Sequence, residues 1–307
     1  MKKIRSILLL PFFLPLGCAH PQSAEDSSAH QSDHTKIIAT DACDIHKAEK
    51  EKAVLILYPG GGNTSVETKK EFDIIKKAKK NHISVIFMNF NNHLWLNNST
   101  CESRTDELET IFTEFQLNRE NIYIGGMSMG GNVALILTDH LIRTSSKVAP
   151  KGVFVVDSPI DLYALFLKAQ KDLQRKGLSE ERLAESRWIV NFFGKEFRSS
   201  DSMAIKIAAI SPFVLTSKKI GLTALRETKL RFYTEPDSLW WRENRGTDFE
   251  DTNAFVIRQI SKQIEGLGWK KFELIETKGK GYRANGNRHP HSWSIVEVDN
   301  LIKWITE

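Results

Sequence analysis

The sequence lacks a long apolar run, a strongly basic stretch and a clustered set of metal ligands. No segment after the first 17 residues is long enough to cross a bilayer as a helix, which needs about 20 apolar residues. The formal net charge is +5, and it falls to +2 if the charged start of the chain is removed. Because a near-balanced chain without a basic stripe binds polyanions poorly, we expect no nucleic-acid partner.

The start of the chain has the pattern of an export signal. Its positive charges are Lys2, Lys3 and Arg5. An apolar run over residues 7–16 follows, too short to span a bilayer, and Gly17-Cys18 comes after it. A charged start, a short apolar core and a small residue before a cleavage point together predict a secretory signal over residues 1–17.

This segment resembles a bacterial lipoprotein signal, in which Cys18 becomes the lipidated first residue of the mature protein. The resemblance implies export and a lipid anchor to a membrane of the bacterial cell envelope. Pro15 and Leu16 depart from the usual lipoprotein pattern, so a plain secretory signal and a soluble periplasmic or secreted protein is the alternative. Residues 18–34 are polar without apolar periodicity, which predicts a solvated tether.

Two cysteines remain after Cys18. Cys43 and Cys101 form an even pair, which can close a disulfide in an oxidising compartment. Two separate buried thiols fit the sequence equally well. Neither cysteine has histidine and acid partners at spacings that indicate a thiol nucleophile.

Apolar runs alternate with helical patterns through the rest of the chain, residues 35–307. We expect buried strands at 53–58, 83–90, 122–124, 152–157, 230–234 and 271–277, with short edge strands at 35–40 and 44–46. This rhythm predicts an α/β fold with a mostly parallel central sheet, helices on both faces, and ligands at the carboxyl ends of the strands. Residues 161–225 break the rhythm, because they carry helical patterns and no strand.

One stretch, Gly126-Met127-Ser128-Met129-Gly130, joins an apolar run to a helical pattern. A strand that turns abruptly into a helix crowds the backbone, and only glycine fits beside the turn residue. The pattern resembles the nucleophile elbow of the α/β-hydrolase family, with Ser128 at the bend. The alternative is a glycine-rich turn that serves only helix packing.

The α/β-hydrolase resemblance implies a helical lid over about 161–225 and a triad in the order nucleophile, acid, histidine. His291 is the expected base, since it lies after the last strand in a His-Ser-Trp sequence similar to the family's histidine loop. His289 is then a supporting or surface histidine. The two histidines also have metal-ligand spacing, but no further ligand set surrounds them, so we expect no metal and no cofactor.

The acid is expected just after the strand at 230–234. Asp237 occupies the position where the family's loop usually delivers its carboxylate. Glu235 is the rival, and Asp157 is a third candidate, because some members take the acid from the preceding strand. Each carboxylate can instead cap a helix or stabilise a loop.

An oxyanion formed during acyl transfer needs backbone N–H donors. The resemblance implies the amide of Met129 as one donor and either Gly61 or Gly62, in the glycine-rich loop after the first buried strand, as the other. That loop lacks the Lys-Ser/Thr pair of a phosphate-binding loop and the glycine spacing of a dinucleotide-binding loop.

Together these features predict a serine hydrolase that cleaves a small-molecule carboxylic ester through an acyl-enzyme. A serine peptidase acting on a peptide substrate is the alternative enzyme, because the same groups cleave amides. A surface lipoprotein that binds a ligand without chemistry is the alternative from another class.

Overall fold

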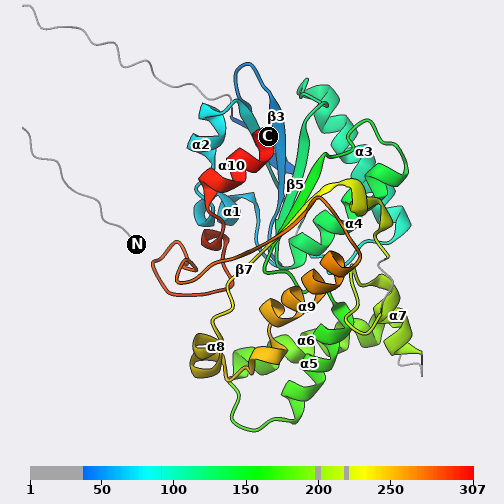
Figure 1. Ribbon diagram of the computed structural model, residues 1–307, viewed down its shortest axis with the longest axis vertical. Coiled ribbons are helices and arrows are strands. Elements are labelled where there is room, and N and C mark those ends of the chain that lie inside the picture. The colour runs from blue at the N-terminus through cyan, green and yellow to red at the C-terminus, as the bar shows by residue number, and fades with distance from the viewer. Residues whose placement is uncertain (1–36, 91, 198–201, 218–220) are drawn as a thin grey trace, which may run out of the picture. The chain divides into compact units, whose positions relative to one another are not determined.

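The computed structural model describes residues 37–90, 92–197, 202–217 and 221–307 (Figure 1). The predicted signal, the tether and Cys18 lie outside these residues, so export and lipidation stay predictions. The described residues, from Ile37 to Glu307, belong to one compact unit. Within the described residues no helix combines the length and apolar character needed to span a membrane.

Eight strands form one sheet in the order β1-β2-β4-β3-β5-β6-β7-β8. The first two, β1 (Ile37–Ala39) and β2 (Cys43–His46), are antiparallel edge strands. The others run parallel: β3 (Ala53–Tyr58), β4 (Ile83–Met88), β5 (Ile122–Met127), β6 (Gly152–Val156), β7 (Lys229–Thr234) and β8 (Phe272–Glu276). All residues of β3 to β6 are buried, which explains their unbroken apolar sequences. The predicted mostly parallel sheet is confirmed.

Helices cover both faces of the sheet (Figure 1). One face carries α1 (Ser65–Glu71), α2 (Ile75–Lys80) and α10 (Val298–Thr306). The other carries α3 (Asn98–Glu114), α4 (Met129–Arg143) and α9 (Asn253–Gly266). Each face has its own buried apolar cluster, so the sheet is the middle layer of three.

Cys43 and Cys101 belong to the apolar cluster on the α3, α4 and α9 face. Both are buried free thiols, so the candidate disulfide is not formed. Burial raises the pKa of the Cys101 thiol to about 11 and also raises that of Cys43. These thiols act as small apolar core residues, the second of the two interpretations that the sequence allowed.

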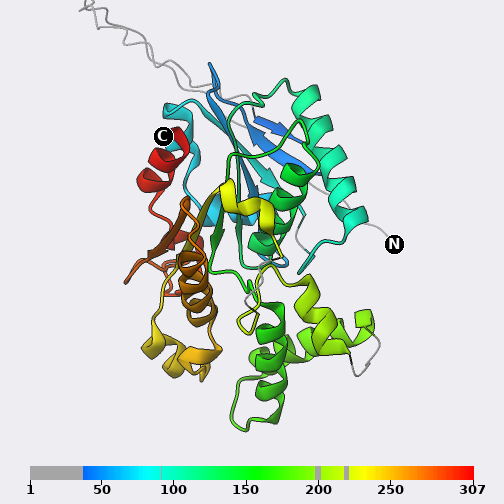
Figure 2. The same cartoon turned by 45° about the vertical axis from the view of Figure 1, so that its right-hand side comes forward.

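The chain between β6 and β7 is helical in its described part, as predicted. It contains α5 (Leu162–Gln174), α6 (Glu180–Phe197), α7 (Met203–Ile210) and the short η1 (Thr223–Glu227). Helices α5, α6 and α7 share a separate apolar cluster that includes Phe166, Ile189 and Phe193. Both views place α5 and α6 at the same end of the sheet as α8 (Ser238–Arg245), which follows β7 (Figures 1 and 2). Their action as a lid remains a prediction.

Candidate active site

Ser128 occupies a sharp turn between β5 and α4. Its backbone has φ 53° and ψ −125°, a conformation that L-residues rarely adopt. A side chain at Gly126 would collide with the carbonyl of Gly130, and one at Gly130 would collide with the carbonyl of Pro59. The two glycines are therefore required for the close approach of the strand, the turn and the helix. The predicted strand–turn–helix setting is confirmed.

Asn132, one turn into α4, holds the surrounding loops in place. It is fully buried, and its side-chain Nδ2 donates to the carbonyl oxygens of Leu94 at 3.2 Å and Pro159 at 3.1 Å. Leu94 precedes α3, and Pro159 follows β6. Both line the cavity at Ser128, so this one buried amide fixes two parts of the cavity wall relative to the turn.

Asp157 follows β6 directly and lies beside the Ser128 turn in the sheet. The Ser128 amide donates to the Val156 carbonyl at 3.0 Å, and the Asp157 amide donates to the Tyr233 carbonyl at 2.8 Å. The backbone hydrogen-bond ladder of the sheet therefore continues past the ends of β5 and β6. Asp157 has φ 45°, which Asp tolerates better than most residues. Its buried carboxylate accepts a hydrogen bond from the Thr234 hydroxyl at 2.6 Å through Oδ1.

The second oxygen of Asp157 contacts His291. The distance from Oδ2 to the imidazole Nδ1 is 2.7 Å. Because a carboxylate oxygen accepts hydrogen bonds, Nδ1 is the donor in this contact, and Nε2 is left as the nitrogen that can accept a proton. His291 lies in the loop between β8 and α10, and it lines the same cavity as Ser128. Among the described residues no hydrogen bond yet joins the Ser128 hydroxyl to the ring.

The prediction that Asp237 orients His291 is wrong. The Asp237 carboxylate caps α8 by accepting from the Trp240 amide at 3.0 Å, and it pairs with Arg288 at 2.7 Å. Its position after β7 is one strand farther from Ser128 than that of Asp157. The carboxylate that contacts the imidazole is thus the third candidate from the sequence.

Glu235, the second candidate acid, also binds elsewhere. It is buried and accepts from the backbone amides of Gly279, Lys280 and Gly281 at 3.1, 2.8 and 3.1 Å. It also pairs with Arg288, three residues before His291. Glu235 and Asp237 therefore act together as a clamp on the loop that carries the histidines.

His289 supports the wall of the site. Its Nδ1 accepts a hydrogen bond from the His291 amide at 3.2 Å, and its ring centroid lies 4.7 Å from that of Trp240 and 5.9 Å from that of Trp241. Burial, followed by the charges of His291, Arg283 and Arg245, lowers the pKa of His289 to about 3. The ring is neutral at physiological pH. No group of three metal-ligating side chains occurs among the described residues.

The residues whose amides are expected to bind an oxyanion come from two places, the loop after β3 and the start of α4. Gly61 and Met129 both line the cavity, and a side chain at Gly61 would collide with the Met129 sulfur. Within the described part of the chain, neither amide has a hydrogen-bond acceptor. Gly62 adopts φ 76° and does not line the cavity, which favours Gly61 of the two predicted glycines.

These groups surround a cavity of about 350 Å³. Helices α5 and α6 contribute Leu165, Trp188 and Ile189 to its wall. The segments after β7 and β8 contribute Trp241 and Arg283 along with the two histidines. The cavity brings together a hydroxyl on a strained backbone turn, an imidazole bound to a buried carboxylate, and backbone amides that have no hydrogen-bond acceptor among the described residues. No sequence pattern predicted that charged side chains such as Arg245 and Arg283 would line this cavity.

The sequence matches no known family model and no curated protein, but the fold recurs in many solved structures. Carboxyl esterase 2 of the fungus Tuber melanosporum is 14% identical, with a TM-score of 0.52 over 92% of this chain and 87% of the esterase. The Francisella virulence factor BioJ is 16% identical, with a TM-score of 0.51 over 88% and 85%. An esterase of the bacterial hormone-sensitive lipase family is 14% identical, with a TM-score of 0.50 over 86% and 80%.

At sequence identities of 14 to 16%, these structures show that the fold is shared, and they do not show that the activity is shared. The chain has the α/β-hydrolase fold, as its nucleophile-elbow pattern predicted.

Proposed function

We propose that this protein is a serine hydrolase that cleaves carboxylic esters, with Ser128 as nucleophile, His291 as general base and Asp157 as the carboxylate that orients the base. The observation that carries the proposal is the 2.7 Å contact between buried Asp157 and His291. It lies in the cavity that also contains the strained Ser128 turn. A buried carboxylate bound to Nδ1 is the arrangement that orients a histidine as a general base, and a histidine that serves only at the surface does not require it.

The reaction follows from the protonation states of these groups. The Ser128 hydroxyl attacks the ester carbonyl while His291 Nε2 takes the hydroxyl proton, and Asp157 stabilises the imidazolium. When the carbon–oxygen bond to the alcohol breaks, His291 returns the proton to the leaving alkoxide. A water molecule, deprotonated by the same nitrogen, then attacks the acyl carbon. As the bond from this carbon to Ser128 Oγ breaks and the acid leaves, His291 returns the proton to Ser128 Oγ. The hydroxyl and imidazole must approach each other on substrate binding, as is common in ligand-free sites.

The amides of Gly61 and Met129 are the proposed donors to the oxyanion. Their lack of acceptors in the described structure supports this role, because donors that are already in place need no rearrangement as charge develops. Helices α5 and α6 are the proposed lid, since their side chains form one wall of the cavity. Solved structures named as esterases on the same fold favour an ester over a peptide substrate.

Turnover of p-nitrophenyl esters of graded acyl length, beside peptide p-nitroanilides, tests the proposal. We expect ester turnover that is abolished by Ser128→Ala, together with a burst of p-nitrophenol equal to the enzyme concentration if deacylation is slow. Faster release from the anilides would identify a peptidase. Absence of turnover with both substrate types would favour a binding protein.

We also propose export and lipid anchoring at Cys18, on the resemblance of the first residues to a lipoprotein signal. The test is fractionation of bacterial cells that make wild type or Cys18→Ser. The proposal requires that wild type sediments with membranes and that the variant does not. Equal partition of both proteins into the soluble envelope fraction would indicate a plain secretory signal.

A further inference from the structure

The cavity wall carries more positive than negative side chains. Four cations line it, namely Lys168, Arg182, Arg245 and Arg283. Two carboxylates, Glu185 and Asp251, also line it. The distribution of these charges matters more than their number, because a cation that is already paired offers little to a ligand.

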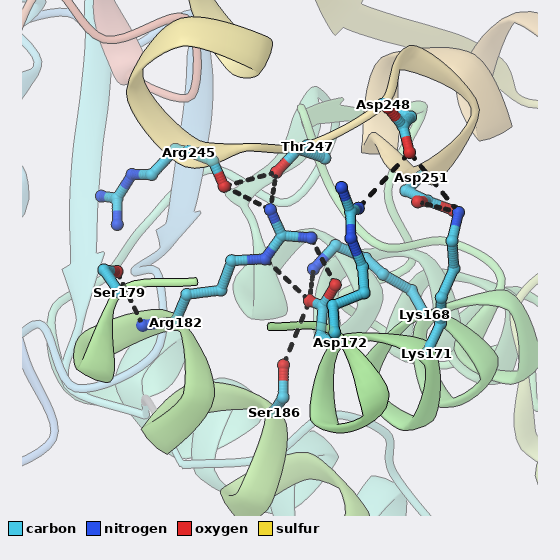
Figure 3. Close-up of polar contacts among 11 residues, drawn as sticks. Lys168, Lys171, Asp172, Ser179, Arg182, Ser186, Arg245, Thr247, Asp248 and Asp251 are labelled. Atoms are coloured by element: carbon cyan, nitrogen blue, oxygen red, sulfur yellow. Dashed lines mark hydrogen bonds and ion pairs between the residues drawn. The ribbon is translucent and has the colours of Figure 1, made fainter. Parts of the chain in front are cut away.

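Two of the cations serve a structural ion cluster. Lys168 and Arg182 both bind the fully buried carboxylate of Asp172, Lys168 at 2.9 Å (Figure 3). Arg182 also donates to the Thr247 hydroxyl and the Arg245 carbonyl, so its guanidinium is fully engaged. This cluster ties α5 and α6 to the segment after α8.

The carboxylates in the wall do not neutralise the other two cations. Asp251 pairs with Lys171 of α5 at 2.5 Å (Figure 3). Glu185 is exposed on α6. In the described residues neither Arg245 nor Arg283 has a carboxylate within ion-pair distance.

Arg245 and Arg283 are held at the histidine side of the cavity. Arg245 ends α8, and Figure 3 shows its guanidinium directed away from the ion cluster that its carbonyl joins. One of its nitrogens lies 3.5 Å from His289 Nε2.

Arg283 is held in a tight turn, in which its amide donates to the Asn287 carbonyl at 2.9 Å. The charge of Glu71 acts on Arg283, but Glu71 Oε2 accepts a hydrogen bond from the Ala284 amide at 3.0 Å.

Burial without an ion pair is costly for a guanidinium, and it lowers the pKa of Arg283. A cavity lined by two guanidinium groups that have no carboxylate partner among the described residues is suited to an anion, because guanidinium forks bind carboxylate and phosphate oxygens with strong, charge-assisted hydrogen bonds.

We propose that the substrate is an ester that carries a second, anionic group, a carboxylate or a phosphate, bound by Arg245 and Arg283. This inference rests on the proposed esterase function, since it places the reacting carbonyl at Ser128. It assigns the two arginines to substrate specificity and leaves the bond-breaking steps to Ser128, His291 and Asp157.

A matched pair of substrates tests the proposal. Mono-p-nitrophenyl adipate and p-nitrophenyl hexanoate have the same acyl length and differ in a terminal carboxylate. We expect a kcat/KM at least about tenfold higher for the adipate, the effect of one charge-assisted hydrogen bond. Arg245→Gln and Arg283→Gln should each reduce this ratio by about tenfold. Arg242→Gln is the control, because Arg242 is exposed on the same helix and does not line the cavity.

The ratio isolates specificity from any loss of general activity in the variants. Equal turnover of the two esters, or a ratio that the arginine variants leave unchanged, would overturn the inference while the esterase function stands. If neither ester is cleaved, the proposed function fails, and calorimetry with Ser128→Ala decides the anion site independently. Binding of adipate that Arg283→Gln abolishes would support the site, and no binding would reject it.

Competitive inhibition identifies the anion. Adipate and hexyl phosphate should both inhibit ester turnover, and hexanol should not, because only the first two carry an oxyanion for the arginines. Tighter inhibition by adipate would indicate a carboxylate on the substrate, and tighter inhibition by hexyl phosphate would indicate a phosphate. Equal inhibition by hexanol would contradict an anion site.

Discussion

The ends of two neighbouring strands, β6 and β7, both present buried carboxylates, and these carboxylates have opposite roles. Asp157 at the end of β6 binds one hydroxyl with one oxygen and gives the other oxygen to His291. Glu235 after β7 is saturated by three backbone amides and Arg288. A carboxylate whose oxygens are all occupied fixes a loop, whereas one with an oxygen left over can orient a base.

The largest effect is expected when the same substitution is made at the two aspartates that follow these strands, Asp157 after β6 and Asp237 after β7. Asp157→Asn should lower kcat/KM on the order of 10³-fold to 10⁴-fold, because the amide no longer holds the proton on Nδ1 of His291. Asp237→Asn should change kcat/KM less than about tenfold, because the Asp237 carboxylate binds the Trp240 amide and Arg288, and His291 takes Asp157 as its carboxylate partner. Steady-state kinetics measure both. Equal losses would mean that both carboxylates serve the base.

The next effect concerns stability. Glu235→Gln should lower the free energy of unfolding by about 2 to 3 kcal/mol, because a neutral amide replaces the buried partner of Arg288 and of three backbone amides. Urea unfolding measures it, with Glu273→Gln as a control for loss of a more exposed acidic partner. A stable Glu235→Gln variant with full activity would show that the clamp on the histidine loop is dispensable.

A smaller effect is expected at the cap of α8. Asp237→Ala should reduce the free energy of unfolding by about 1 kcal/mol, the usual cost of losing a helix N-cap. Asp237→Ser restores a capping oxygen without the charge and should recover most of the loss. If Ser and Ala variants are equally unstable, the Arg288 pair is the more important contact.

A separate effect is a pH dependence of stability. The pKa of His289 is about 3 in the folded protein against an ordinary 6.5, so between these values the unfolded chain binds a proton that the folded chain does not. Stability therefore falls as pH falls below about 6.5. His289→Phe keeps a ring against Trp240 and removes this contribution, so its Tm should fall less steeply between pH 6.5 and pH 4. Parallel curves would assign the acid sensitivity to other groups.

The sequence was sufficient to predict the sheet, the turn at Ser128 and the histidine loop, because each depends on local patterns. Unbroken apolar runs identify buried parallel strands, and two glycines identify the turn. The acid depends instead on which strand end lies nearest to His291, which is a matter of strand order and loop path. Asp157 and Asp237 both follow a buried strand, and no local pattern separates them. Arg245 and Arg283 likewise come together only through folding.

Covalent labelling by a fluorophosphonate probe tests the central claim most directly, because only an activated serine hydroxyl reacts with it. The account predicts that wild type is labelled on Ser128, that Ser128→Ala is not labelled, and that Asp157→Asn is labelled far more slowly than Asp237→Asn. Labelling of the Ser128→Ala protein at an equal rate, or no labelling of wild type, would contradict it.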